Sequence, residues 1–353
     1  MGWDIGGAHL KAAIIKLPSD VVSIYQRPCP LWKGLDKLQE AVRAILAESS
    51  LPIQYHSLTM TGELVDLFDG RNDGVKQILS AMRRLLDDSE VMVYAGMDGL
   101  LRIGDVRADH YPNIASANWL ASASWAAQKM GDGLFVDIGS TTTDILLLGD
   151  GKVMAEGYSD YQRLITQELI YTGIVRTPIM AIAPTAQDQG KAVGLMAEYF
   201  ATMADVYRVT GELNELHDQN DTADGAEKTV SASAKRLSRM LGCDYNESEL
   251  TRWQQFAQNL RAQQLARIQA ACERQLQRFG SPRNCPVIGA GIGRFLVEEI
   301  ATNLGHSYQD FSALFSSNAQ QSVYTVADCA PAVAVGCLAG MVKANEDFSR
   351  ANT

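Results

Sequence analysis

Two copies of one strand–turn–strand pattern constrain this chain more than any other feature of its sequence. The tripeptide Asp-Ile-Gly stands at 4–6 and again at 137–139, and each copy leads from one apolar run into the next. Short apolar runs rich in strand-forming residues predict β-strands, and the polar residues between them predict a turn. Because the pattern recurs in matching contexts, we expect a duplicated fold with one such turn in each half.

The second turn is built for anion binding rather than for burial. Its residues after Ile138 are one glycine and four hydroxyl side chains, followed by Asp144. Glycine lets the backbone approach a ligand closely, and successive backbone N–H groups in a turn form a concave anion site. The predicted phosphate-binding residues of this turn are Gly139, Ser140, Thr141 and Thr142.

The first turn, with Gly6 and Gly7, repeats this arrangement. Seven residues after the aspartate, the first copy has Lys11 where the second has Asp144. The carboxylates of Asp4 and Asp137 would repel a bare phosphate, so they fit beside one only with a hard cation between them. We therefore expect Asp4 and Asp137 to bind Mg²⁺.

A third glycine-rich loop occupies 287–293. It follows a strand-like run and precedes a helix-like segment at 294–300. Gly289 and Gly291 are its predicted phosphate-binding residues.

The order of these three loops resembles that of the actin, sugar kinase and Hsp70 superfamily. The sequence is most similar to the hydantoinase and oxoprolinase-related branch, and within it to the family associated with tetrahydromethanopterin-linked one-carbon transfer. The resemblance spans nearly the whole chain and rests on five segments: 4–11, 60–64, 113–119, 137–144 and 171–178.

This resemblance implies an α/β fold: a duplicated actin-like ATPase fold, related to ribonuclease H, with two lobes and a mostly helical insertion. We expect the first lobe over 1–130, and the second over 131–185 and 281–345. The helical subdomain is expected over 186–280, with helices at 191–213, 229–241 and 249–279, and a tail at 346–353. Two helices rich in small residues are expected, at 113–129 and 330–342.

Archaeal members of the resembled family join a furan to a tyramine-glutamate unit during methanofuran synthesis. The resemblance thus implies a transferase in which a phenol oxygen displaces diphosphate from a furanylmethyl diphosphate. Such an enzyme must stabilise the leaving group and needs a base for the phenol proton. Lys11 is expected to stabilise the diphosphate, and Asp144, Glu63 and His9 are the alternatives for the base.

Two residues are candidates for binding the acceptor substrate. Asn118 lies in the first small-residue helix beside Trp119, whose ring offers a flat surface to an aromatic substrate, although a core position suits a tryptophan as well. Arg176 has the planar guanidinium that suits a carboxylate or phosphate, and a surface ion pair is its alternative role. An ATP-dependent hydantoinase- or oxoprolinase-like hydrolase or ligase, and a non-catalytic nucleotide-binding protein of the actin class, remain alternative functions.

Composition limits the partners. The chain has 353 residues and a net charge of −10, which disfavours nucleic acid and anionic membranes. We find no apolar run of about 18 residues and no room for a signal peptide before the first strand. The six cysteines form no C-x-x-C pair, which argues against a zinc site. We expect a cytoplasmic enzyme of small-molecule substrates, with a homodimer as one expected state.

Overall fold

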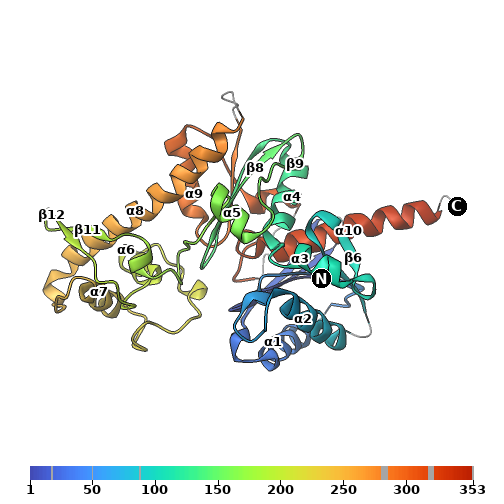
Figure 1. The fold of residues 1–353 in the computed structure, drawn as a ribbon, viewed down its shortest axis with the longest axis horizontal. Helices are drawn as coiled ribbons and strands as arrows, with labels where there is room; N and C mark the ends of the chain where they lie inside the picture. Colours follow the sequence, from blue (N-terminus) through green and yellow to red (C-terminus); the bar gives the residue numbers. More distant parts are fainter. Residues whose placement is uncertain (17–18, 50, 87–88, 280–284, 317–321, 352–353) are drawn as a thin grey trace. The chain divides into compact units, whose positions relative to one another are not determined.

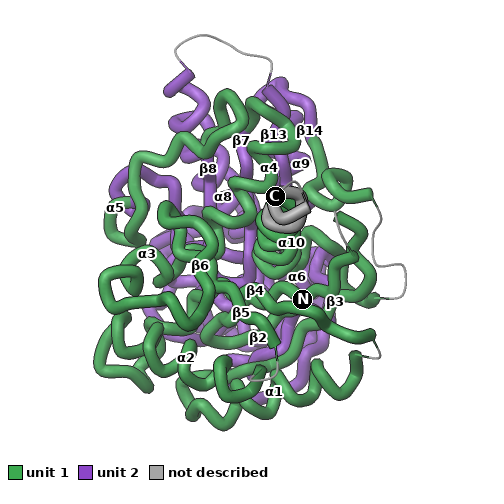
Figure 2. The backbone as a smooth tube through the Cα atoms, turned by 90° about the vertical axis from the view of Figure 1, so that its right-hand side faces the viewer, with its two compact units in different colours: residues 1–133, 147–162, 309–353 green, residues 134–146, 163–308 purple. Residues whose placement is uncertain are grey.

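The chain forms two compact units. The computed structural model describes residues 1–353 except 17–18, 50, 87–88, 280–284, 317–321 and 352–353 (Figure 1), and of 346–351 it describes only the backbone. Unit 1 comprises residues 1–133, 147–162 and 309–353 (Figure 2). Unit 2 comprises residues 134–146 and 163–308.

The sheet of unit 1 has six strands in the order β3-β2-β1-β4-β5-β6. They are β1 (Gly2–Ile5), β2 (His9–Lys16), β3 (Asp20–Pro28), β4 (Tyr55–Met60), β5 (Glu90–Tyr94) and β6 (Leu100–Arg102). β1 is antiparallel to β2 and parallel to β4, and β4 is parallel to β5. The carboxyl ends of β1, β4 and β5 therefore meet at one edge of the sheet, where open α/β sheets bind ligands.

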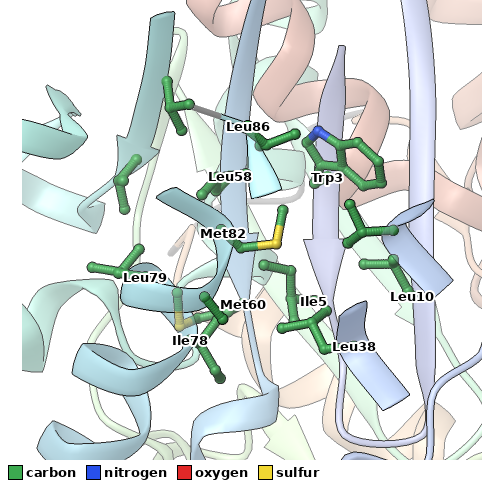
Figure 3. Packing of buried hydrophobic residues seen from close by; sticks show 14 of the residues in the cluster. Trp3, Ile5, Leu10, Leu38, Leu58, Met60, Ile78, Leu79, Met82 and Leu86 are labelled. Carbon is green, nitrogen blue, oxygen red and sulfur yellow. The ribbon is translucent and has the colours of Figure 1, made fainter. Parts of the chain in front are cut away.

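One face of this sheet packs against α1 (Leu35–Glu48) and α2 (Arg71–Leu85). Alternate residues of a strand point to opposite faces, and Trp3, Ile5 and Leu58 point into the core beneath these helices (Figure 3). The buried residues of α1 recur at three- and four-residue spacing, which places them on one side of the helix. The alternating pattern of apolar and polar residues thus produces both the strands and the helix that covers them.

The opposite face packs against α10 (Ala330–Ala351). Gly2 lies on this face, and a Cβ at Gly2 would stand 2.0 Å from the carbonyl oxygen of Ala332. Glycine is required there because the helix approaches the strand backbone so closely. The second small-residue helix is therefore confirmed. It continues to Ala351, so the tail predicted from 346 is helical over 346–351, and 352–353 lie outside the described residues.

Contrary to the expectation from the sequence, one segment, 327–345, which includes most of α10, is long and apolar enough to cross a membrane by length and composition. However, 78% of an 18-residue apolar stretch within this segment is buried inside the protein, as is typical of a core helix. The expected cytoplasmic location stays a prediction.

The first small-residue helix differs from its prediction over 113–129. It is divided into α3 (Tyr111–Ile114) and α4 (Asn118–Met130). Between them Ser116 has φ of 52°, in the left-handed region that an α-helix excludes. The interruption places the Ser116 hydroxyl beside Glu63 instead of on a continuous helix surface.

The second sheet repeats the strand order of the first. Its order is β10-β8-β7-β13-β14, with β9 (Lys152–Val153) paired to β8. The five strands are β7 (Gly133–Ile138), β8 (Thr143–Gly149), β10 (Leu169–Ile170), β13 (Val287–Ala290) and β14 (Tyr308–Asp310). Numbered within their own sheet, they follow the order 3-2-1-4-5, as β1 to β5 do. The duplicated α/β fold is therefore confirmed, and each predicted turn joins the first and second strands of its sheet.

The predicted helical segment 186–280 contains three α-helices and most of a hairpin. The helices are α6 (Met203–Thr210), α7 (Val230–Arg239) and α8 (Leu250–Gln277), and the hairpin joins β11 (Thr185–Asp188) to β12 (Lys191–Gly194). The helix predicted over 191–213 is wrong in its first half. Gln189 and Gly190 both have positive φ, which is the conformation of a two-residue hairpin turn, so 191–194 pairs as a strand.

Two buried arginines hold this helical block together. Arg236 donates from Nε to Oδ1 of Asp205 at 2.8 Å, and Arg208 donates from Nη2 to Oδ2 of Asp218 at 2.6 Å. Arg208 and Arg236 are 4% and 0% exposed. Removing one partner would leave an uncompensated buried charge, so we assign these residues a structural role.

The compact units group the chain differently from the predicted lobes. Residues 147–162 and 309–353 belong to unit 1, although the second lobe was expected over 131–185 and 281–345. The reason is the packing of α10 on the first sheet and against α4. Segment 186–280 lies within unit 2, and the expected boundary at 281 falls outside the described residues.

Candidate active site

The first phosphate turn lies at the carboxyl end of β1. The N–H of Gly6 donates to the carbonyl oxygen of His9 at 3.0 Å, which closes the turn between β1 and β2. A Cβ at Gly6 would stand 2.8 Å from that oxygen, and one at Gly7 would stand 2.9 Å from Cγ1 of Val65. Gly6 is thus required by the packing of the backbone, whereas a side chain at Gly7 would have to displace only the Val65 methyl group.

Asp4 and Lys11 are opposite one another in the β1–β2 register. Directly opposite residues on neighbouring strands have adjacent side chains on the same face. Asp4 is 6% exposed. Nζ of Lys11 donates to the carbonyl oxygen of Asp328 at 2.7 Å, which holds the ammonium near this end of the sheet.

The loop after β4 carries the candidate base Glu63, within the short helix η2 (Gly62–Leu64). Glu63 is 0% exposed, and its burial raises the pKa of the carboxyl group. Ser116 Oγ donates to Glu63 Oε1 at 2.7 Å, whereas Glu63 Oε2 is buried and has no hydrogen-bond partner among the described residues. A carboxyl group with a raised pKa is suited to proton transfer near neutral pH.

Two charged residues, Arg71 and Asp160, lie beside Glu63 and Ser116. We call these four residues the Glu63 cluster. Arg71 Nη2 donates to Ser116 Oγ at 2.7 Å, forms an ion pair with Asp160, and lies 3.6 Å from Glu63 Oε1. A hydroxyl group donates one hydrogen bond and accepts two. Ser116 Oγ, which donates to Glu63 and accepts from Arg71, therefore keeps one acceptor position.

A cavity of 230 Å³, which we call the small cavity, is lined by sequence neighbours of the Glu63 cluster, although Glu63, Arg71, Ser116 and Asp160 are not among its lining residues. Its walls include Ala115 and Ala117, which flank Ser116 in sequence, and Ser159, which precedes Asp160. Trp119 and Tyr158 also line it, with ring centroids 6.3 Å apart. Trp119 is 3% exposed, as a core tryptophan would be, and its role as a surface for an aromatic substrate stays a prediction. The predicted substrate residue Asn118 instead begins α4, where its Oδ1 accepts from the N–H of Trp119 at 2.8 Å.

In unit 2, the backbone of residues 174–176 donates hydrogen bonds to the second phosphate turn. The N–H of Gly139 donates to the carbonyl oxygen of Thr142 at 2.9 Å, and the N–H of Ile174 donates to that of Gly139 at 3.1 Å. A Cβ at Gly173 would stand 2.5 Å from the Gly139 carbonyl oxygen. Within the described residues, the hydroxyl of Ser140 is buried and has no hydrogen-bond partner. Such an orphaned oxygen beside backbone N–H groups suits a turn that binds an anion or a metal ion.

The structure places Arg176 beside this turn. Its Nη1 lies 3.4 Å from Oγ1 of Thr141, and its backbone N–H donates to the carbonyl oxygen of Ser140 at 2.9 Å. The guanidinium, predicted to hold an anionic group of the acceptor, thus stands at the predicted phosphate site of unit 2.

The third glycine loop packs directly on the second turn. Gly291 has φ of 78°, and a Cβ there would stand 2.3 Å from Oδ1 of Asp137. It would also stand 2.3 Å from the carbonyl oxygen of Ile138, so close packing requires glycine at this position. At Gly289 a Cβ would stand 2.6 Å from the ring of Tyr308, and packing accounts for this glycine as well.

The candidate base Asp144 forms an ion pair with Arg163, which is 1% exposed. Arg163 also donates to the carbonyl oxygen of Glu168 at 3.2 Å. Because the Asp144 carboxylate compensates a buried charge, the structure gives it a structural role and makes Glu63 the stronger candidate base. His9 lies at the start of β2, and its role as a base stays a prediction.

The magnesium site can be tested only in part. Among the described residues, no three His, Cys, Asp or Glu side chains are grouped as metal ligands. Mg²⁺ usually takes one or two carboxylates together with water and substrate phosphates, so a single aspartate at a phosphate turn fits it. Asp137, with the buried Ser140 hydroxyl in the same turn, has this character. Asp4 belongs to the other unit, and joint binding by Asp4 and Asp137 stays a prediction.

Sequence reasoning missed three members of the Glu63 cluster. Ser116 lies within the segment 113–119 that carries the family resemblance, but the expected continuous helix hid its contact with Glu63. Arg71 and Asp160 are 89 positions apart, and no local signal joins them.

Comparison with known proteins identifies the family. A family model described as hydantoinase/oxoprolinase matches residues 54–329. The (4-{4-[2-(gamma-L-glutamylamino)ethyl]phenoxymethyl}furan-2-yl)methanamine synthase of Methanocaldococcus jannaschii is 33% identical over 245 residues, which are 69% of this chain and 72% of that protein. The synthase of the same name from Methanococcus vannielii is 35% identical over 114 residues, 32% of this chain and 51% of that protein.

A solved structure, component A of the (R)-2-hydroxyglutaryl-CoA dehydratase of Acidaminococcus fermentans, aligns over 97% of this chain and 98% of its own. Its identity is 10% and its TM-score is 0.48, so the assignment rests on the family model, the synthase and the repeated strand order. The chain belongs to the hydantoinase/oxoprolinase family and has a duplicated α/β fold.

Proposed function

We propose that this protein condenses a furanylmethyl diphosphate with the phenol oxygen of a tyramine-glutamate acceptor and releases diphosphate. The observation that carries the proposal is the 33% identity to the Methanocaldococcus jannaschii synthase. The name of that synthase describes a furan joined through an oxymethyl link to a phenyl ring with a γ-glutamylaminoethyl chain. The ether link is the bond that such a condensation would form.

In the proposed reaction one bond forms and one breaks at the furanylmethyl carbon. The phenol oxygen supplies the electron pair of the new C–O bond, and diphosphate leaves with the pair of the old one. The phenol proton passes to Ser116 Oγ as the proton of that hydroxyl passes to Glu63. The remaining acceptor position of Ser116 Oγ and the 2.7 Å contact with Glu63 support this relay.

The leaving diphosphate carries the developing negative charge, so oriented donors and cations beside it favour the transition state. Within unit 1 the candidates for this role are the turn at Gly6 and Gly7 and the ammonium of Lys11. Within unit 2 the candidates are the turn from 139 to 142 and the guanidinium of Arg176. Asp4 and Asp137 would hold Mg²⁺, which neutralises diphosphate charge when bound.

One observation favours a second candidate, an ATP-dependent hydrolase or ligase: the family model that matches 54–329 is named for hydantoinase and oxoprolinase. In that case the phosphate turns would bind ATP. The transferase would consume a furanylmethyl diphosphate, whereas the hydrolase or ligase would consume ATP, so one assay can distinguish the two functions.

The test is to incubate the purified protein with Mg²⁺, [5-(aminomethyl)furan-3-yl]methyl diphosphate and γ-glutamyltyramine, and to measure the ether by mass spectrometry and diphosphate by an enzymatic assay. We expect ether and diphosphate in equal amounts, without ATP. The matched control replaces the donor with the corresponding alcohol. Ether formation from the alcohol that requires ATP, or no ether from either donor, would contradict the proposal.

A further inference from the structure

A second cavity in unit 1, of 540 Å³, adjoins the small cavity. The two share four lining residues, Gly96, Met97, Leu120 and Tyr158, so they are neighbouring parts of one hollow. We propose that this large cavity binds the far end of the acceptor, the chain para to the phenol that ends in a carboxylate. This inference rests on the proposed function and takes the phenol ring to occupy the small cavity, whose walls include Ala115 and Ala117 on either side of Ser116 in sequence.

The walls of the large cavity match an amphipathic chain. Leu100, Leu120, Leu338 and Val342 supply apolar surface between β6, α4 and α10. Ligand sites are usually apolar cavities of about 300–1,000 Å³ with a few polar groups that fix orientation, and this cavity falls in that range. The small cavity, at 230 Å³, has room for the ring end of the acceptor but not for its whole chain.

The lining of the large cavity also includes polar side chains that could bind the amide and the carboxylate of the acceptor chain. Tyr94 and Ser124 present hydroxyl groups 3.4 Å apart, and the amide of Gln128 also lines the wall. Lys152 is the charged residue of the lining, and within the described part of the chain no aspartate or glutamate lines this cavity. An ammonium without a lining carboxylate favours an anionic ligand, so the cavity selects an acceptor that carries a carboxylate at its far end.

The test compares two acceptors, γ-glutamyltyramine and tyramine, which share the phenol but differ in the charged chain. In Lys152→Glu we expect KM for γ-glutamyltyramine to rise about tenfold or more, with kcat within twofold and KM for tyramine unchanged. Lys152 is exposed, so the substitution does not disturb the core. Lys76→Glu, an exposed charge reversal on α2 of the same unit, is the matched control and should leave both KM values unchanged.

A second variant tests whether binding needs the volume of the large cavity, rather than the charge of Lys152. Gln128 is an exposed residue of α4 that lines the large cavity, and Gln128→Trp should narrow it without loss of folding. We expect the KM for γ-glutamyltyramine to rise about tenfold and that for tyramine to change less than twofold.

Calorimetry separates failure of this inference from failure of the proposed function. Without any furan donor, γ-glutamyltyramine should bind the unsubstituted protein about tenfold more tightly than Lys152→Glu. Unchanged affinity and unchanged KM in Lys152→Glu and Gln128→Trp would overturn the cavity assignment while turnover stands. Absence of turnover with every donor would overturn the proposed function, and Lys152-dependent binding would then still support the cavity assignment.

Discussion

At the residue scale, Glu63 shows how a loop acid becomes a candidate base. Its position after a strand predicts that it lies at the ligand-binding edge of the sheet, and the structure agrees. Its burial and its contact with Ser116 could not be predicted, because both depend on the interruption between α3 and α4. Similarly, Asp144 pairs with the buried Arg163, and the ring of Tyr308 packs on Gly289. Both partners come from other segments of the chain, and no local sequence pattern connects them.

Glu63→Gln should lower kcat by about 10²-fold or more, on the scale of lost general-base catalysis. The same substitution should change how stability depends on pH. Burial raises the pKa of Glu63 in the folded state, so the folded protein binds this proton more tightly than the unfolded chain. The stabilising contribution is therefore complete below the unfolded pKa and is lost as pH rises through the folded pKa.

Glutamine does not titrate, so Glu63→Gln should gain stability relative to the unsubstituted protein as pH rises from about 4 to 8. Thermal unfolding followed by circular dichroism over that range measures the difference in Tm. Glu198→Gln, at an exposed position, is the control and should show no such trend. A difference in Tm that does not vary with pH would show that the Glu63 proton is not more tightly bound in the folded state.

At the element scale, segments with a clear apolar period were predicted well. The helix expected at 229–241 and the strand–turn–strand pattern around the second Asp-Ile-Gly agree with α7 and the β7–β8 pair. Prediction failed where a few backbone angles decide the structure. Ser116 interrupts a helix and Gln189 begins a hairpin turn, and both have the positive φ that non-glycine residues seldom adopt.

The contact between β1 and α10 gives a prediction for one element pair. Gly2→Ala should lower the free energy of unfolding by about 2–3 kcal/mol, because the new Cβ meets backbone atoms that cannot move independently. Those atoms are the carbonyl oxygen of Ala332, at 2.0 Å, and the backbone nitrogen of Gly336, at 2.8 Å. Urea denaturation measures the change.

The matched control is Gly104→Ala in the same unit, where a Cβ would have no neighbour within 4 Å. It should change the free energy of unfolding by less than about 0.5 kcal/mol, as is usual for surface substitutions. Equal stability of Gly2→Ala and Gly104→Ala would show that α10 and β1 are not so closely packed.

At the scale of the whole molecule, the recurrence of Asp-Ile-Gly predicted the duplication, and the two sheets with the same strand order confirm it. The division into compact units could not be predicted from the repeat. The carboxyl-terminal α10 packs on the first sheet, so a segment distant in sequence belongs to unit 1. Hydrophobic pattern indicates that a helix is buried but does not indicate which sheet covers it.

The central proposal is that the Asp-Ile-Gly turns bind magnesium diphosphate, and the most direct test is calorimetric titration of diphosphate into the protein. We expect binding that requires Mg²⁺ and that weakens at least tenfold in Asp4→Asn and, separately, in Asp137→Asn, while circular dichroism shows both variants folded. Equal affinity with and without Mg²⁺, or undiminished affinity in either variant, would contradict the claim.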